Sequence, residues 1–149
     1  MKTPKILIRI AAILMLVHLL GHTMGFSGWK KATDPAQQEI IKQMTGPKFP
    51  FMGAIHSMGD YYDGFGYGCS IAILLFILVL WFVSGELNTS PRLAKKVLLS
   101  VSLCILAWGI DEILFFFPFA ICVTMLTFVL TITAYFLYKP GELVVNKPL

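Results

Sequence analysis

The 149-residue chain contains few charged residues. Only 13% of its residues are Asp, Glu, Lys or Arg, whereas 57% are hydrophobic; an average soluble domain carries about a quarter charged residues. A soluble protein of this size cannot bury that much apolar surface, and a disordered chain does not contain it. The 12 basic residues are scattered at the ends of apolar segments, so they do not form the basic patch of a nucleic-acid-binding protein. We therefore expect the lipid bilayer to surround most of the chain.

Long apolar runs are what the sequence has in abundance. A membrane helix needs about 20 mostly apolar residues. Residues 64–85 carry no charge, and residues 97–138 carry only Asp111 and Glu112. At 1.5 Å per residue the latter run would extend over about 63 Å, twice the hydrocarbon thickness, so it must fold back on itself. Pro118 supplies the break, because proline suits a first helical turn and its preceding residue avoids helical geometry.

The sequence thus predicts an all-α fold, a bundle of four transmembrane helices that makes residues 1–149 a single integral membrane domain. The first loop adds a short amphipathic helix, for which Asp34-Pro35 is the start signal and Gly46-Pro47 the end signal. The expected membrane helices cover residues of about 6–26, 52–85, 91–115 and 118–138.

The distribution of Lys and Arg predicts the orientation of these helices. Eight basic residues flank the helices on the side of the termini and four lie on the other side, and cytoplasmic flanks are the more basic ones. Both termini are therefore expected in the cytoplasm, in a bacterial inner membrane. The eight residues are Lys2, Lys5, Arg9, Arg92, Lys95, Lys96, Lys139 and Lys147; the four are Lys30, Lys31, Lys42 and Lys48.

All three histidines and four of the eight acidic residues are expected in the outer half of the membrane. Ionisable side chains at that depth are costly unless they face a partner, a cavity or water, so they are candidates for function. With two aromatic neighbours they make up the predicted ligand-binding set. Its members are His18, His22, His56, Asp60, Asp63, Tyr67, Trp108, Asp111 and Glu112.

Helical periodicity places these residues on three polar faces. His18 and His22 are four residues apart, with Gly21 and Gly25 beside them, so a neighbouring helix can approach that stripe. If the second helix begins near Met52, then His56, Asp60, Asp63 and Tyr67 follow one face of it. Cys104, Trp108, Asp111 and Glu112 share a face of the third helix.

Three chemistries fit such a cluster. His18, His22, His56 and Asp60 offer ligands for zinc, copper or iron, and two histidines such as His22 and His56 suit a haem. Alternatively, a histidine and a carboxylate can move a proton on a small lipophilic ligand. Leu19 stands where a zincin motif requires glutamate, and no Glu-x-x-His pair of a di-iron site occurs.

The sequence does not decide whether the protein is an enzyme. The main interpretation is a His/carboxylate site that binds a metal or a small ligand, with or without catalysis. The alternative is a structural or accessory membrane subunit, in which the polar residues only fix helix packing.

Two short motifs, His18-Leu19-Leu20-Gly21-His22 and Asp63-Gly64-Phe65-Gly66, resemble those of small four-helix bacterial membrane proteins of unassigned function. The resemblance covers most of the chain and implies the four-helix architecture, but no activity. The sterol-isomerase-like membrane fold is a more distant analogy, because it also gathers carboxylates inside a small helical bundle.

Overall fold

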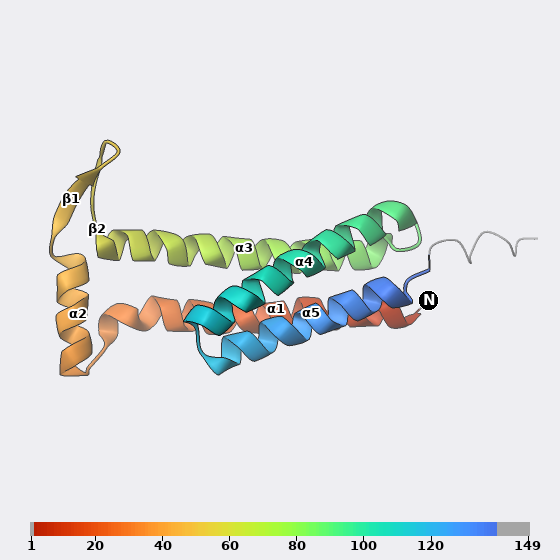
Figure 1. Ribbon diagram of the computed structural model, residues 1–149, viewed down its shortest axis with the longest axis horizontal. Coiled ribbons are helices and arrows are strands. Elements are labelled where there is room, and N and C mark those ends of the chain that lie inside the picture. The colour runs from red at the N-terminus through yellow and green to blue at the C-terminus, as the bar shows by residue number, and fades with distance from the viewer. Residues whose placement is uncertain (1, 140–149) are drawn as a thin grey trace, which may run out of the picture. The chain divides into compact units, whose positions relative to one another are not determined.

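The computed structural model, in which residues 2–139 are described, is almost entirely helical (Figure 1). Four helices have the length and composition of membrane spans: α1 (Lys2–Gly28), α3 (Met58–Glu86), α4 (Pro91–Phe115) and α5 (Pro118–Leu137). The first loop contains the 3-10 helix η1 (Trp29–Lys31), the helix α2 (Pro35–Thr45) and the strands β1 (Lys48–Phe51) and β2 (Ala54–Ser57). The predicted all-α class, with four membrane helices and a short helix in the first loop, is confirmed.

The chain divides into two compact units, which we describe separately. The bundle unit combines the chain up to His18 with the chain from Leu74 onward, and it contains segments of all four long helices. The loop unit is the intervening stretch, Leu19–Ile73. The candidate site residues are divided between these two units.

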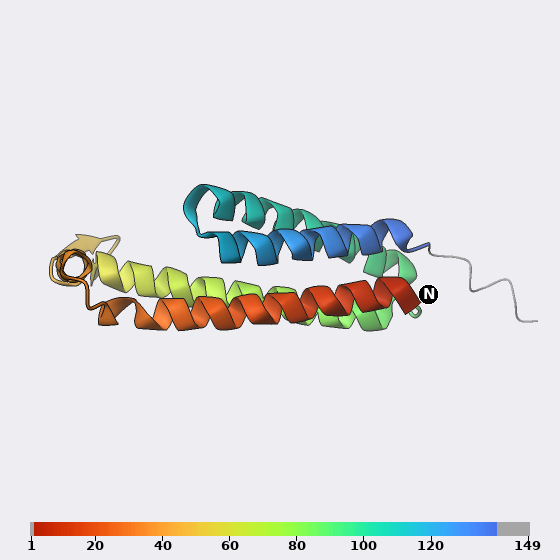
Figure 2. The ribbon, with the colours of Figure 1, turned by 90° about the horizontal axis from the view of Figure 1, so that it is seen from below.

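Helices α4 and α5 form an antiparallel hairpin within the bundle unit (Figure 2). Their bounds agree with the sequence prediction, because Pro91 and Pro118 each occupy a first helical turn and only Phe116 and Phe117 separate the helices. Small side chains let the two backbones approach: a Cβ atom on Gly109 would lie 2.6 Å from Sδ of Met125. Close packing of small residues is the usual way in which membrane helices associate.

Polar contacts join the other helices of the bundle unit at the end where α4 begins. Nε of Arg9 donates to Oγ of Ser84 at 3.5 Å, and the guanidinium lies over the Trp81 ring, 5.2 Å from its centroid. The Tyr138 hydroxyl donates to the carbonyl oxygen of Leu87. Burial raises the pKa of Tyr138, so this phenol keeps the proton that it donates. The first contact joins α1 to α3, and the second joins the residue after α3 to the residue after α5.

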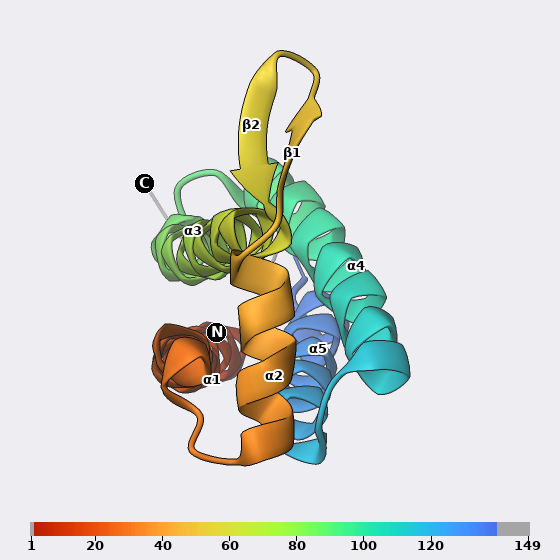
Figure 3. The ribbon, with the colours of Figure 1, turned by 90° about the vertical axis from the view of Figure 1, so that its left-hand side faces the viewer.

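The predicted start of the second helix near Met52 is wrong. Residues 48–57 instead form a two-stranded antiparallel hairpin, visible in Figure 3, and α3 begins at Met58. The two residues of its turn, Met52 and Gly53, have φ values of 48° and 87°, the positive pair that a type I′ hairpin turn requires. Pro50 also disfavours a helix at this place. His56 therefore lies on β2 and not on the helix.

Candidate functional site

Two buried ionisable side chains of the bundle unit, His18 and Glu112, contact each other. Nε2 of His18 lies 3.3 Å from Oε1 of Glu112, and the two side chains are 6% and 2% exposed. His18 belongs to α1 and Glu112 to α4, so the pair joins two predicted spans. The pair thus brings together two residues of the predicted ligand-binding set, from two different helices.

Two neutral side chains also contact the pair. Oγ1 of Thr124 lies 3.0 Å from Nδ1 of His18, and the indole Nε1 of Trp108 donates to Oε1 of Glu112 at 2.9 Å. Trp108 is held in turn by an edge-on contact with Phe76 of α3. We call His18, Trp108, Glu112 and Thr124 the buried tetrad; it receives one side chain from α1, one from α5 and two from α4.

Helix geometry explains why these residues meet. Trp108 and Glu112 are four residues apart and therefore share a face of α4. Glu112 precedes the end of α4 by three residues, and Thr124 follows the start of α5 by six, so both lie within about 9 Å of the connecting turn. Gly109 on α4 brings α5 close, since the methyl group of Thr124 also lies 3.4 Å from the position of its Cβ.

Thr124 is the member that the sequence analysis missed. Threonine carries no charge and belongs to no metal or catalytic motif here. A signal did exist: Ala120, Thr124, Thr127, Thr131 and Ala134 recur at three- and four-residue intervals, and these are the buried residues of α5. Small and polar residues at such spacing mark the face of a membrane helix that packs on protein.

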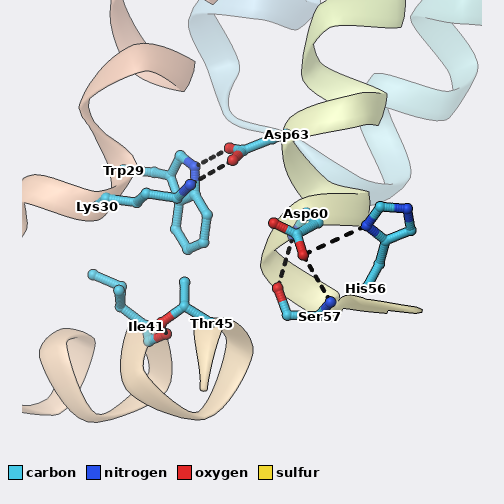
Figure 4. A network of polar contacts seen from close by, with 8 residues as sticks. All are labelled: Trp29, Lys30, Ile41, Thr45, His56, Ser57, Asp60 and Asp63. Carbon is cyan, nitrogen blue, oxygen red and sulfur yellow. Dashed lines mark hydrogen bonds and ion pairs between the residues drawn. The ribbon is translucent and has the colours of Figure 1, made fainter. Parts of the chain in front are cut away.

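The loop unit contains a second polar cluster, centred on Asp63 (Figure 4). Its carboxylate accepts a hydrogen bond from Nε1 of Trp29 at 2.9 Å and another from Nζ of Lys30. The indole of Trp29 also packs edge-on against Tyr62. This arrangement ties the residues that follow α1 to the first turns of α3, and it uses an aromatic and a cation that both suit a membrane interface.

His56 and Asp60 make a separate, more exposed pair. Nδ1 of His56 lies 3.7 Å from Oδ2 of Asp60, and about half of each side chain is exposed. The Asp60 carboxylate also accepts the backbone N–H of Ser57 at 2.8 Å, while the Ser57 hydroxyl accepts the N–H of Asp60. This reciprocal exchange is a capping box, and it explains why α3 begins at Met58.

His22 and Tyr67 meet a single aromatic residue, Phe26. The His22 ring stacks on Phe26, which packs edge-on against Tyr67. Nε2 of His22 also lies 3.1 Å from the carbonyl oxygen of Gly66. A Cβ atom on Gly66 would lie 2.0 Å from the Phe26 ring, so a glycine is required for this approach. The predicted close approach at Gly25 is wrong, because a Cβ atom there would meet nothing within 4 Å.

The remaining predicted site residue, Asp111, is exposed on α4, next to Glu112 but on a different side of the helix. Across residues 2–139, no group of three or more His, Cys, Asp or Glu side chains is arranged to hold a metal ion. The four predicted metal ligands therefore form no such group: His18 pairs with Glu112, His56 with Asp60, and His22 contacts a backbone carbonyl.

Comparison of the chain with protein-family models, with curated proteins and with solved structures found no match. Of the polar groups described, the buried tetrad combines a base, an acid and a hydroxyl on buried side chains with the indole N–H of the partly buried Trp108, which is the composition of an acid–base or ligand-binding site.

Proposed function

We propose that this integral membrane protein binds a small lipophilic ligand at the buried tetrad, in the outer half of its bundle. The observation that carries the proposal is the His18–Glu112 pair, which is almost fully buried in helices that are apolar enough to lie in lipid. Ionisable pairs at such depth are expensive to maintain, and they mark functional sites in membrane proteins.

The hydrogen bonds of His18 suit a group that gains and loses a proton. With the proton on Nε2, the imidazole donates to Glu112 and accepts from the Thr124 hydroxyl at Nδ1. When the ring is doubly protonated, the hydroxyl can turn and accept instead, because it is both donor and acceptor. The ligand class that matches this chemistry is an apolar molecule with a carbonyl or hydroxyl oxygen, which would replace the Thr124 hydroxyl at Nδ1 of the imidazolium.

The other predicted ligand residues, His22, His56, Asp60, Asp63, Tyr67 and Asp111, stay outside this proposal. Four of them have contacts within the loop unit that account for their positions. His22 contacts a backbone carbonyl, and Asp63 accepts a hydrogen bond from an indole. Asp60 caps α3 and pairs with His56. We therefore restrict the site to the buried tetrad and favour an organic ligand over zinc, copper, iron or haem.

The test is chemical analysis of the purified full-length protein. Wild type, His18→Gln and the matched control His56→Gln would be purified in detergent without a metal-binding tag, and bound organic molecules and metals would be measured by mass spectrometry. We expect a lipophilic molecule at near-equimolar amounts in the wild type and in His56→Gln, and its loss from His18→Gln. A metal in place of an organic molecule, or an equal content in all three proteins, would overturn the proposal.

The second candidate function is structural. One observation favours it: both ring nitrogens of His18 already have partners inside the protein. A packing role predicts that His18→Gln lowers the thermal midpoint while no bound molecule is lost.

We also propose that both termini are cytoplasmic, in a bacterial inner membrane. The proposal is supported by the excess of basic residues on that side, of which Lys147 lies outside the described residues. After replacement of the three natural cysteines by serine, a single cysteine at Lys42 should react with a membrane-impermeant maleimide in intact cells. A cysteine at Ser90 should react only after lysis, and the reverse pattern would invert the topology.

A further inference from the structure

A basic pocket of about 280 Å³ lies between the first turns of α4 and the last turn of α5, within the bundle unit. Three cations, one aliphatic residue and one aromatic residue line it: Arg92, Lys95, Lys96, Leu99 and Tyr135. We call this set the basic pocket. None of its residues belongs to the buried tetrad, so it is a second and independent feature.

The cations of the basic pocket are available to a ligand. Among residues 2–139, no carboxylate forms an ion pair with Arg92, Lys95 or Lys96. Lys95 is held in place: its Nζ donates to the carbonyl oxygen of Tyr138 at 3.1 Å and lies 4.8 Å from the Tyr135 ring centroid. One cation is thus fixed at the wall, while the exposed Arg92 and Lys96 side chains provide the remaining positive charge.

The position of the pocket along the helices matches the headgroup layer of a bilayer. The 20 residues of α5 extend over about 30 Å, which equals the hydrocarbon thickness, and Tyr135 lies in the last turn. Arg92 follows the first residue of α4 at the same end of the hairpin. Tyrosine and long basic side chains concentrate at this level because their polar ends reach the headgroups.

Apolar residues continue the face of α4 from the pocket towards the membrane centre. Leu99 lines the pocket, and Leu103, one turn further along α4, is 53% exposed. An acyl chain can lie on these two leucines while its phosphate meets the cations. A free phosphate ion would use only the charged part of this surface.

We propose that the basic pocket binds the phosphate of an anionic phospholipid, with Arg92 and Lys96 as the charged contacts and Leu99 beneath the acyl chain. Under the topology proposed above, the pocket faces the cytoplasmic leaflet, in which juxtamembrane basic groups meet anionic lipids. A phosphate with two or three basic partners is a recurrent arrangement, in which arginine binds two oxygens at once.

The test measures lipid preference of the full-length protein. Wild type would be mixed with equal amounts of phosphatidylglycerol and phosphatidylcholine in detergent, and bound lipid counted by native mass spectrometry. The pocket variant is Arg92→Gln/Lys96→Gln; the matched control is Lys31→Gln/Lys42→Gln, which removes the same charge from exposed positions in the first loop. Lys95 stays unchanged because its Nζ also donates a hydrogen bond to the carbonyl oxygen of Tyr138.

We expect the wild type and the control to prefer phosphatidylglycerol. The pocket variant should bind that lipid about 30-fold more weakly than the wild type does. Equal losses in the pocket variant and the control would overturn the proposal, because the effect would then be one of net charge. A parallel titration with inorganic phosphate distinguishes the other source. If phosphate alone displaces the bound lipid at millimolar concentration, the site is one for the free ion and the lipid proposal fails.

Discussion

Trp108 and His18 converge on one oxygen atom of Glu112. The indole Nε1 and the imidazole Nε2 lie 2.9 Å and 3.3 Å from Oε1, and they come from α4 and α1 respectively. A hydrogen-bond donor from the same helix thus positions a carboxylate for a partner on another helix, which is how surrounding residues orient ionisable groups in functional sites.

Replacing Trp108 by phenylalanine isolates the indole hydrogen bond. The Phe side chain keeps a ring next to Phe76 but cannot donate to Glu112, so the free energy of unfolding should fall by about 1.5–3 kcal/mol. Reversible unfolding in mixed detergent micelles would measure the change. A Trp108→Phe protein as stable as the wild type would show that the indole bond does not hold Glu112.

The energetics of the pair itself are accessible through leucine substitutions. His18→Leu leaves a buried carboxylate with one fewer partner and should cost about 3–5 kcal/mol, whereas His18→Leu/Glu112→Leu removes both polar groups and should recover most of that loss. The same unfolding assay applies to both. If the double variant folds well but carries no ligand, the pair serves binding; additive losses would contradict direct coupling of the two side chains.

Gly66 and Gly64 offer a matched comparison on one helix. Gly66→Ala places a methyl group against the Phe26 ring and should lower the thermal midpoint, because the ring must leave its stack with His22. Gly64→Ala meets nothing within 4 Å and should be neutral or stabilise the helix by up to about 1 kcal/mol. Equal effects of the two substitutions would mean that the Phe26 ring does not occupy this place.

The turn between β1 and β2 should respond in opposite directions to substitution at its two positions. Met52 adopts a φ of 48°, which methionine tolerates poorly and asparagine well, so Met52→Asn should stabilise the hairpin by about 1 kcal/mol. Gly53→Ala should destabilise it, because φ is 87° there. Hydrogen exchange of the backbone amides of residues 48–57 reports both changes, and protection that falls in Met52→Asn would argue against the turn.

How far the sequence predicted this molecule depends on the range of the interactions involved. Asp34 and the three prolines at positions 35, 91 and 118 act within one turn of the chain, and the helix starts that they predict are observed. The hairpin was missed because its turn uses Met52 in place of the asparagine that normally marks such a turn. The capping box of Ser57 and Asp60 sets the start of α3 at Met58.

The candidate site was predicted in part for a related reason. The cost of burying charge in lipid selected His18 and Glu112, and these two side chains meet although they are 94 positions apart. The same argument also selected Asp60 and Asp63, which lie outside the bundle unit. Asp60 accepts a hydrogen bond from the backbone N–H of Ser57 at the start of α3, and Asp63 accepts one from the indole of Trp29. Thr124 was not predicted because a neutral hydroxyl carries no charge whose burial in lipid would be costly.

The tight connection between α4 and α5 limits what the protein exposes to water at that end of the two helices. Phe116 and Phe117 are all that separates the two helices, and with Phe115 they form an apolar cap without a charge. Such a cap offers no charged side chain to antibodies, proteases or other water-soluble proteins. Under the proposed topology, the segment that contains η1, α2 and the β-hairpin is the longer connection on that side, and it offers a water-soluble partner the charged residues that the α4–α5 connection lacks.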